Sequence, residues 1–285
     1  MLKKNVLGAA ILASVMGMPA LAGGHATVEG YALADGGKSL LVMADIKSGD
    51  AASAKALEKA VSAIAWRPVT GDLLGFANGH IYSIDPATGA MTDLGANFAA
   101  DTKIAADAAI AFDFNNKIDA VRAVSSAGDN LVYFPEGFGD NDERAGSVRR
   151  FTGLAYAEGD SMEGKTPAVF ANAYTNAISG AKAADTFQYA LDAETDALIS
   201  LANNAGTLAT IAPITVDGKA VDLAPIGGFD IVSAEEGDNK AYAILQMEGA
   251  DTSGLYNINL ETGEATKLTA LSVGNITGFA ARIGG

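Results

Sequence analysis

From about residue 27 onward, apolar and polar residues alternate in short runs, and turn-forming pairs such as Gly36-Gly37 and Asn78-Gly79 separate the runs. A period of two is typical of β-strands that bury one face, and such pairs are typical of tight turns. Residues 51–61 are the one stretch whose spacing resembles a helix. The pattern therefore predicts an all-β protein.

Two short motifs recur along the chain. In the first, small residues lead into an aromatic residue, at 63–66, 109–112, 153–156, 226–229 and 276–279. The aromatic residues are Trp66, Phe112, Tyr156, Phe229 and Phe279. In the second motif, an alternating strand runs into a turn rich in Asp, Thr and Gly, at 81–89, 187–195 and 255–263. Recurrence of one strand-and-turn unit indicates a repeat architecture.

The spacing of the aromatic residues predicts a closed β-propeller. They are separated by 46, 44, 73 and 50 residues, and a four-stranded blade needs about 40 to 50. We expect five four-stranded blades, with an aromatic motif on each innermost strand. Residues 276–283 then supply the innermost strand of the blade whose outer strands come from residues 27–60, and this pairing closes the ring.

Two alternatives to five blades stay open at this point. The strands could form a β-sandwich with coincidental spacing, or the 73-residue interval could hold a sixth blade. With five blades, the excess length of that interval forms insertions near 177–186 and 205–225. Propeller topology is expected to place both insertions on the face opposite the acidic loops described below.

Residues 1–22 have the pattern of a secretory signal peptide. Lys3 and Lys4 precede an apolar run over 6–18, and Ala20-Leu21-Ala22 is a small-x-small cleavage site. The run is shorter than the roughly 20 residues that span a bilayer. We expect cleavage near Ala22, export to the periplasm or beyond the cell, no membrane insertion afterwards, and a single domain over residues 23–285.

Composition removes several classes of function. The net charge of −15, from 34 acidic and 19 basic residues, disfavours binding to nucleic acid or to an anionic membrane surface. The chain has no cysteine, which excludes disulfides and thiolate metal sites. Its two histidines, His25 and His80, are too few for a multi-histidine metal site.

Two acidic loops form a candidate Ca²⁺ site. The expected topology places loop 135–146 beside loop 157–167 at one blade boundary. Their acidic residues are Asp140, Asp142, Glu143, Glu158, Asp160 and Glu163. Ca²⁺ prefers six to eight hard oxygen ligands, which such loops offer. The alternative is that these are solvated loops on an acidic protein.

Three charged residues follow the repeated aromatic residues and are expected near the central axis: Arg67, Asp113 and Asp230. One interpretation is a structural ion pair between Arg67 and Asp113, since charges in protein cores are usually paired. The other is that the three side chains line a polar channel that binds a small ligand.

Several motifs are specific in combination. An I-A-W-R-P-V-T-G-D-L-L-G run occupies 64–75, an I-Y-S-I-D-P-A-T-G run occupies 81–89, and shorter matches lie at 112–115, 119–125, 130–131, 173–176, 227–230 and 253–256. Through them the chain resembles, over nearly all of residues 23–285, a bacterial exported family of unknown function with propeller-like repeats. The chain departs from the family pattern at Ala120 and keeps Arg122. The resemblance implies the fold and export, and no activity.

Two functions are consistent with the sequence. The first is an exported, non-catalytic propeller of unknown specific role that binds a protein, a glycan or a small ligand, with Ca²⁺ as a candidate cofactor. The second is a metal-dependent propeller hydrolase, such as a lactonase, which needs Ca²⁺ held at the axis by Asp113 and Asp230. The sequence offers only these two axial acids and no nearby histidine. It therefore favours the first function, and we assign no catalytic residue.

Overall fold

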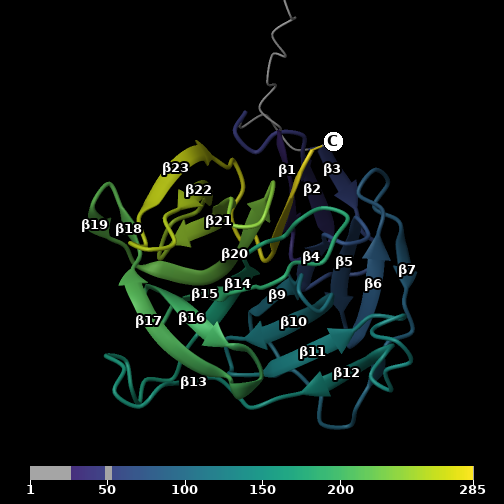
Figure 1. Ribbon diagram of the computed structural model, residues 1–285. Coiled ribbons are helices and arrows are strands. Elements are labelled where there is room, and N and C mark those ends of the chain that lie inside the picture. Colours follow the sequence, from purple (N-terminus) through teal and green to yellow (C-terminus); the bar gives the residue numbers. More distant parts are fainter. Residues whose placement is uncertain (1–26, 49–52, 285) are drawn as a thin grey trace, which may run out of the picture.

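The computed structural model describes residues 27–48 and 53–284. Their strands form five sheets of four or five strands around one axis, which is a five-bladed β-propeller (Figure 1). The predictions of an all-β fold and of five blades are confirmed, and the sandwich and six-blade alternatives are wrong. The predicted signal peptide over residues 1–22, its cleavage site and His25 lie outside the described residues.

Each blade is described from its innermost to its outermost strand. Blade 1 contains β24 (Phe279–Ile283), β1 (Val28–Ala34), β2 (Ser39–Met43) and β3 (Ser53–Ala56). Blade 2 contains β4 (Ala63–Arg67), β5 (Asp72–Ala77), β6 (His80–Ile84) and β7 (Met91–Asp93). Blade 3 contains β9 (Ile110–Asn115), β10 (Ala120–Ser125), β11 (Asn130–Phe134), β12 (Ser147–Arg150) and β8 (Asn97–Phe98).

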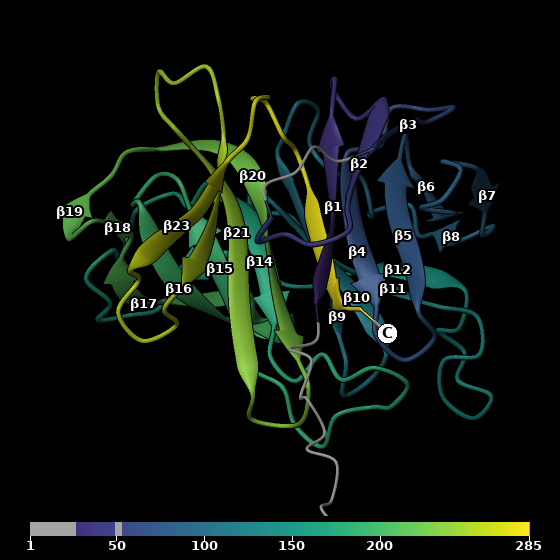
Figure 2. The ribbon, with the colours of Figure 1, turned by 90° about the horizontal axis from the view of Figure 1, so that it is seen from above.

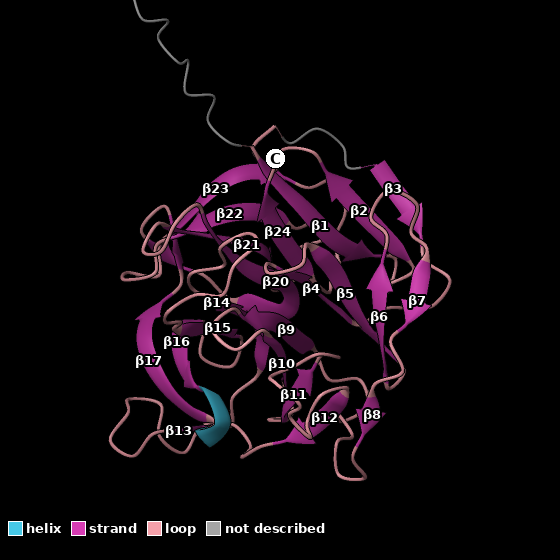
Figure 3. Ribbon diagram, turned by 45° about the vertical axis from the view of Figure 1, so that its right-hand side comes forward, coloured by secondary structure: helices cyan, strands magenta, loops and turns pink. Residues whose placement is uncertain are grey.

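Blade 4 contains β14 (Val169–Tyr174), β15 (Gln188–Asp192), β16 (Ala197–Ala202), β17 (Thr207–Pro213) and β13 (Ala155–Tyr156). Blade 5 contains β20 (Leu223–Ser233), β21 (Asn239–Met247), β22 (Gly254–Ile258) and β23 (Ala265–Ala270). The described part of the chain also has a hairpin of β18 (Thr215–Val216) and β19 (Lys219–Ala220) and one 3₁₀ turn, η1 (Asn203–Ala205) (Figure 3). None of its helices is long and apolar enough to span a membrane.

The last strand closes the ring. β24 pairs antiparallel with β1, with Ile283 opposite Val28 and Phe279 opposite Ala32. Blade 1 therefore combines residues from the two ends of the described chain, as the spacing predicts. Closure pairs β1 on both of its edges, so β1 does not expose the backbone N–H and C=O groups of an open blade.

Small residues let the innermost strands come close together. A Cβ atom built on Gly228 of β20 would clash with the backbone of Phe279 in β24. Ala63 and Ala65 of β4 share one apolar cluster with Phe112 of β9. Small residues of one blade thus face an aromatic ring of the next, which is the packing that the first sequence motif predicts.

The innermost strands all run in one direction along the axis, from a top face to a bottom face (Figure 2). Loops that lead into these strands lie on the top face, and turns that leave them lie on the bottom face. The connection over 177–186, between β14 and β15, lies on the bottom face, which it shares with loop 135–146 between β11 and β12. The prediction that the insertion near 177–186 lies on the face opposite loop 135–146 is therefore wrong. Loop 157–167 leads into β14 and lies on the top face.

The prediction that the motif at 153–156 forms the innermost strand of blade 4 is wrong. Tyr156 lies in β13, which pairs parallel with β17 at the outer edge, and the innermost strand is β14 with Phe170. The Tyr156 hydroxyl donates to Asp192 at 2.5 Å, which anchors this outer strand. Apolar and polar residues alternate in the same way on inner and outer strands, so the motif could not distinguish the two kinds of strand. With Phe170, the intervals on either side become 58 and 59 residues.

Two smaller expectations also change. Residues 53–56 form the edge strand β3, so the helical interpretation of residues 51–61 is wrong. Part of the segment 205–225 is not an insertion, because β17 lies within it and completes blade 4, whereas β18 and β19 form a separate hairpin. An alanine-rich edge strand carries little hydrophobic alternation, which explains why its type was misread.

Deleting residues 276–285 should abolish the cooperative thermal unfolding transition. The deletion removes β24 and the fully buried side chains of Ile276 and Phe279. Each large buried side chain contributes about 3–5 kcal/mol, and whole domains have only about 5–15 kcal/mol of stability. Calorimetry of this variant, with a chain ending at Ile283 as the matched truncation, makes the measurement. A melting temperature equal in both would contradict the closure.

Candidate functional site

The axis opens at the bottom face into a cavity of about 130 Å³, which we call the bottom cavity. Its lining includes Trp66 of blade 2, Asp113 of blade 3, Asp230 of blade 5 and Arg282 of blade 1. The structure thus places two of the three predicted axial residues in one cavity. They come from strands that lie far apart in the sequence.

Backbone N–H groups of the following blade hold both carboxylates. Asp113, 5% exposed, accepts a hydrogen bond from the N–H of Tyr174 at 2.7 Å. Asp230, 4% exposed, accepts one from the N–H of Ala281 at 2.6 Å and one from the N–H of Ile231 at 2.7 Å. The two side chains therefore link blade 3 to blade 4 and blade 5 to blade 1.

Burial makes ionisation of this pair unfavourable. It raises the pKa of Asp230 to about 7. It also raises the pKa of Asp113 well above the usual range, and repulsion from the Asp230 carboxylate raises it further. Among the described residues, no basic side chain forms an ion pair with either carboxylate. The bottom cavity is a site that prefers a proton or a cation.

Arg67 does not line this cavity. Its Nε donates to Asp119 Oδ1 at 2.8 Å and its Nη2 to Asp119 Oδ2 at 2.5 Å, and its guanidinium lies 5.9 Å from the ring centre of Phe114. The expected ion pair with Asp113 is replaced by this one. Arg67 is the last residue of β4, so its side chain meets the turn after β9 and not the middle of that strand.

A third axial polar residue, Asn172 on β14, was missed by the sequence analysis. It is 1% exposed, and neither its amide nitrogen nor its amide oxygen has a hydrogen-bond partner. It lines a channel of about 10 Å³ to which all five innermost strands or their leading residues contribute. The available signal was a lone Asn in the otherwise apolar strand V-F-A-N-A-Y.

The axis also opens at the top face, into a cavity of about 360 Å³ that we call the top cavity. Val61, Ile110, Phe170 and Ile226 give it apolar walls, and Ser126 is one of its few polar groups. The volume lies in the range of small-molecule sites. A second cavity of about 750 Å³, the side cavity, adjoins it. The two share Ser62, Asp107, Ala108 and Ile110.

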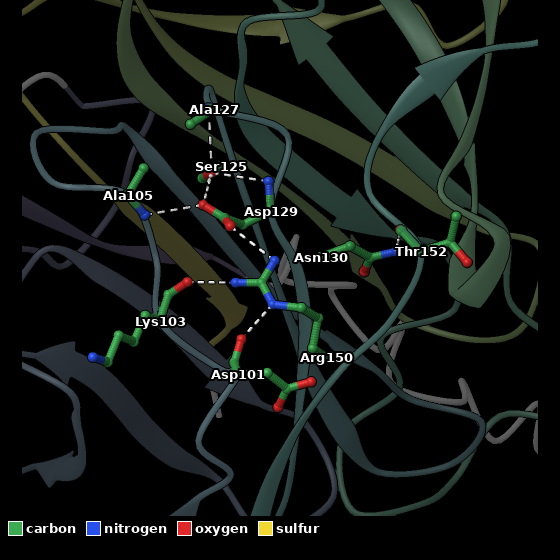
Figure 4. Close-up of polar contacts among 9 residues, drawn as sticks. All are labelled: Asp101, Lys103, Ala105, Ser125, Ala127, Asp129, Asn130, Arg150 and Thr152. Carbon is green, nitrogen blue, oxygen red and sulfur yellow. Dashed lines mark hydrogen bonds and ion pairs between the residues drawn. The ribbon is translucent and has the colours of Figure 1, made fainter.

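The segment 99–109, which leads into β9, forms a wall of both cavities, and Arg150 fixes it (Figure 4). The Arg150 guanidinium donates to the carbonyl oxygens of Asp101 and Lys103 and to Asp129 Oδ1 at 2.9 Å. Asp129 Oδ2 accepts the N–H of Ala105 at 3.1 Å. One ion pair on blade 3 therefore holds the wall at three points.

The six acidic residues predicted to bind Ca²⁺ are not brought together. Asp140, Asp142 and Glu143 lie in the bottom-face loop, whereas Glu158, Asp160 and Glu163 lie in the top-face loop. Asp142 is paired with Arg144 at 2.6 Å, and Asp160 accepts the N–H and hydroxyl of Thr210 at 2.7 Å. Within residues 27–48 and 53–284, no three His, Cys, Asp or Glu side chains are grouped to hold a metal ion.

Two further residues singled out by the sequence have structural partners. Arg122, 3% exposed, donates to Tyr174 Oη at 2.9 Å and to the side-chain oxygens of Asn130 and Asn204, which joins blades 3 and 4. His80 Nδ1 lies 2.8 Å from Asp93 Oδ2 on an exposed part of blade 2. Neither residue lines the cavities described above.

The family described as "Domain of unknown function (DUF4394)" matches residues 29–280. No curated protein sequence matches the chain. Solved structures with a similar fold include a gluconolactonase from Xanthomonas campestris (TM-score 0.45, 14% identity, 87% of this chain and 77% of that chain). A second is a chain of a nidogen/laminin complex (TM-score 0.44, 10% identity, 89% of this chain and 98% of that chain). A third is an auxiliary nutrient binding protein from Bacteroides ovatus (TM-score 0.42, 14% identity, 74% of this chain and 52% of that chain). The chain spans about half the length of the last.

The buried acid pair should make the protein less stable as the pH rises. A carboxyl group whose pKa is raised on folding stabilises the folded protein fully below its pKa in the unfolded chain, which is about 4. This stability is lost as the pH rises through the pKa in the folded protein, which is about 7 for Asp230. In buffer that contains a chelator, the melting temperature of the unmodified protein should decrease as the pH rises from about 4 to about 7. Asp113→Asn should reduce this fall by about 2 °C or more.

Asp140→Asn is the control for this measurement, because it removes one negative charge from an exposed loop. Its pH profile should match that of the unmodified protein. If Asp113→Asn gave the same profile too, the buried pair would not be the source of the pH dependence.

Proposed function

We propose that this chain, which belongs to the DUF4394 family of domains of unknown function, is an exported binding protein that holds a small organic ligand in its top cavity. One observation carries the proposal: all five blades, or the segments that lead into them, line this single cavity. Gly36, Val61, Ala109, Phe170 and Pro225 come from blades 1 to 5 in turn. Export rests on the sequence pattern of residues 1–22.

The lining of the cavity indicates the kind of ligand. Its walls are mainly apolar, with hydroxyl groups from Ser62, Ser126 and Thr277. Among the described residues that line it, Asp107 is the one titratable side chain. Asp107 forms no ion pair among the described residues, and Lys103 lines the side cavity but not the top cavity. A carboxylate of this kind, on a chain of net charge −15, favours neutral or cationic ligands over anions. The adjoining side cavity gives room for a longer molecule.

Filling the top cavity should strongly weaken ligand binding without unfolding the protein. Ala108 lines both cavities and is only half-buried, so Ala108→Phe places a ring in the cavity at little cost to the core. We expect neutral or cationic members of a small-molecule panel to raise the melting temperature, and carboxylates of equal size not to. Calorimetric affinity for these ligands should fall at least about tenfold in Ala108→Phe.

The matched control for this experiment is Ala127→Phe, because Ala127 is exposed and lies outside the lining of these cavities. Its affinities should equal those of the unmodified protein. Ligands that bind Ala108→Phe as tightly as the control would place the site elsewhere. A panel that produces no shift at millimolar concentration would contradict the proposal as well.

Loss of the Arg150 contacts should weaken the same binding. Arg150→Gln removes the ion pair to Asp129 and the bonds to the carbonyl groups of Asp101 and Lys103, so the cavity wall is no longer held. We expect several-fold weaker binding in calorimetry and faster amide exchange over residues 101–108. Arg149→Gln, on the adjacent exposed residue, makes the same charge change and should alter neither quantity. Unchanged exchange in Arg150→Gln would contradict this role.

A metal-dependent hydrolase is the second candidate, favoured by the two carboxylates that share the bottom cavity. It requires a cation there and a substrate that reaches it from the bottom face. Lactones, esters and phosphoesters belong in the same panel, assayed for turnover with Ca²⁺. Turnover lost in Asp113→Asn and retained in Ala108→Phe would support this candidate, and turnover unaffected by both would count against it.

A further inference from the structure

The two carboxylates of the bottom cavity form no ion pair with a basic side chain of the described chain. Arg282 lines the same cavity and is paired with Glu29 at 2.7 Å. Arg122 stands opposite Asp113 in the pairing of β9 with β10, but its guanidinium donates to the side chains of Tyr174, Asn130 and Asn204 and to no carboxylate. Asp113 and Asp230 are both at least 95% buried. Burying two carboxylates that form no ion pair is costly, so the site favours a positively charged occupant.

Asn172 adds a neutral oxygen to this pair. Side chains two residues apart on a strand share one side of the sheet, so Asn172 lies on the same side of β14 as Tyr174. The N–H of Tyr174 donates to Asp113, and the Tyr174 hydroxyl meets Arg122, which places this side of β14 against blade 3. The Asn172 amide is therefore aimed at the boundary where the Asp113 carboxylate lies, and both of its polar atoms are unpartnered.

There is room for an ion at this point of the axis. The channel beside Asn172 has a volume of about 10 Å³, which is close to the space of one water-sized sphere. Phe112 and Phe229, the residues immediately before Asp113 and Asp230, line the same channel. Below it, the bottom cavity of about 130 Å³ offers space for water molecules that complete a coordination shell.

We propose that Asp113, Asn172 and Asp230 form a binding site for a hard divalent cation, Ca²⁺ being the best match. The existing hydrogen bonds leave lone pairs on both carboxylates, since each carboxylate oxygen accepts two. Ca²⁺ takes six to eight oxygen ligands in flexible geometry and tolerates several waters. A water molecule alone would satisfy the Asn172 amide but would not compensate the negative charge of the carboxylates when they lose their protons.

This inference does not rest on the proposed ligand site, because the cation binds near the bottom cavity and the organic ligand in the top cavity. It deepens the hydrolase alternative by adding Asn172 as a ligand, and it holds whether or not the protein is catalytic. The proposed ligands differ from the acidic residues of loops 135–146 and 157–167, which the sequence suggested as Ca²⁺ ligands.

Trp66 provides a local readout for the test. It is the only tryptophan of the chain and lines the bottom cavity together with Asp113 and Asp230. Tb³⁺ bound at this site should show luminescence sensitised by tryptophan excitation, and Ca²⁺ should displace it. The signal should disappear in Trp66→Phe, whereas Tb³⁺ on distant surface acids gives no tryptophan-sensitised signal.

The variants separate a cation from a trapped water. After treatment with a chelator, Asn172→Ala and Asp113→Asn should each bind Ca²⁺ at least about tenfold more weakly in calorimetry, whereas Asp140→Asn should bind it as the unmodified protein does. Asn172→Ala should not lower the melting temperature of the metal-free protein, because this side chain has no hydrogen bond to lose. It should reduce the stabilisation that Ca²⁺ gives.

Three results would overturn the proposal. The first is the absence of sensitised Tb³⁺ luminescence that Ca²⁺ displaces in the unmodified protein. The second is Ca²⁺ affinity in Asn172→Ala and Asp113→Asn equal to that of Asp140→Asn. The third is a change of melting temperature in Asn172→Ala with unchanged Ca²⁺ affinity, which would assign a water molecule to the site. Ligand binding at the top cavity can succeed or fail independently of all three.

Discussion

Five innermost strands converge on one axis, and the space between them is the constraint on which the rest of the structure depends. Gly228 and Gly278 lie where a Cβ atom would crowd a neighbouring innermost strand or the core side chains beside it. Small residues at these positions let the strands approach, and the channel that remains is only about 10 Å³. The axis is therefore closed at its waist and widens at each end. Both cavities follow from this geometry, since strands that diverge from a tight waist leave space at the two faces.

The same constraint explains why the axis carries polar residues. Strands this close have backbone N–H groups that no strand of another blade pairs with, and Asp113 and Asp230 accept two of them across blade boundaries. These bonds hold the ring together, but they bury negative charge, which a low-dielectric site resists. A cation at Asn172 would relieve that cost. The structural and the binding roles of the two acids are thus compatible, and a single substitution tests both.

Much of the fold was predictable because the same short sequence motif recurs in most blades of the propeller. The aromatic residue after small residues identified four innermost strands, including β24, whose pairing with β1 closes the ring. The fifth was missed because Tyr156 matches the motif while serving the outer edge of blade 4. A strand motif reports alternation and says little about distance from the axis. That one error also displaced loop 157–167 to the wrong face and created the apparent Ca²⁺ site with loop 135–146.

The candidate site was harder to predict, for reasons that concern three-dimensional position. Asp113 and Asp230 stood out because each directly follows a repeated aromatic residue, whereas Asn172 lies on β14, the innermost strand that the motif did not identify. The role of Arg150 could not be predicted, since nothing in the sequence shows that segment 99–109 folds back over blade 3 to meet it.

The two proposed binding sites lie at opposite ends of one axis. The top cavity has apolar walls and a wall segment held by a single ion pair, which suits a site that must admit an organic molecule. The bottom cavity has buried charge on rigid strands, which suits a small ion and little else. Because the tight waist separates them, a ligand at one end cannot touch an ion at the other. Coupling between the two sites has a direct route through β9, β14 and β20. The early residues of these strands line the top cavity, and their later residues include Asp113, Asn172 and Asp230.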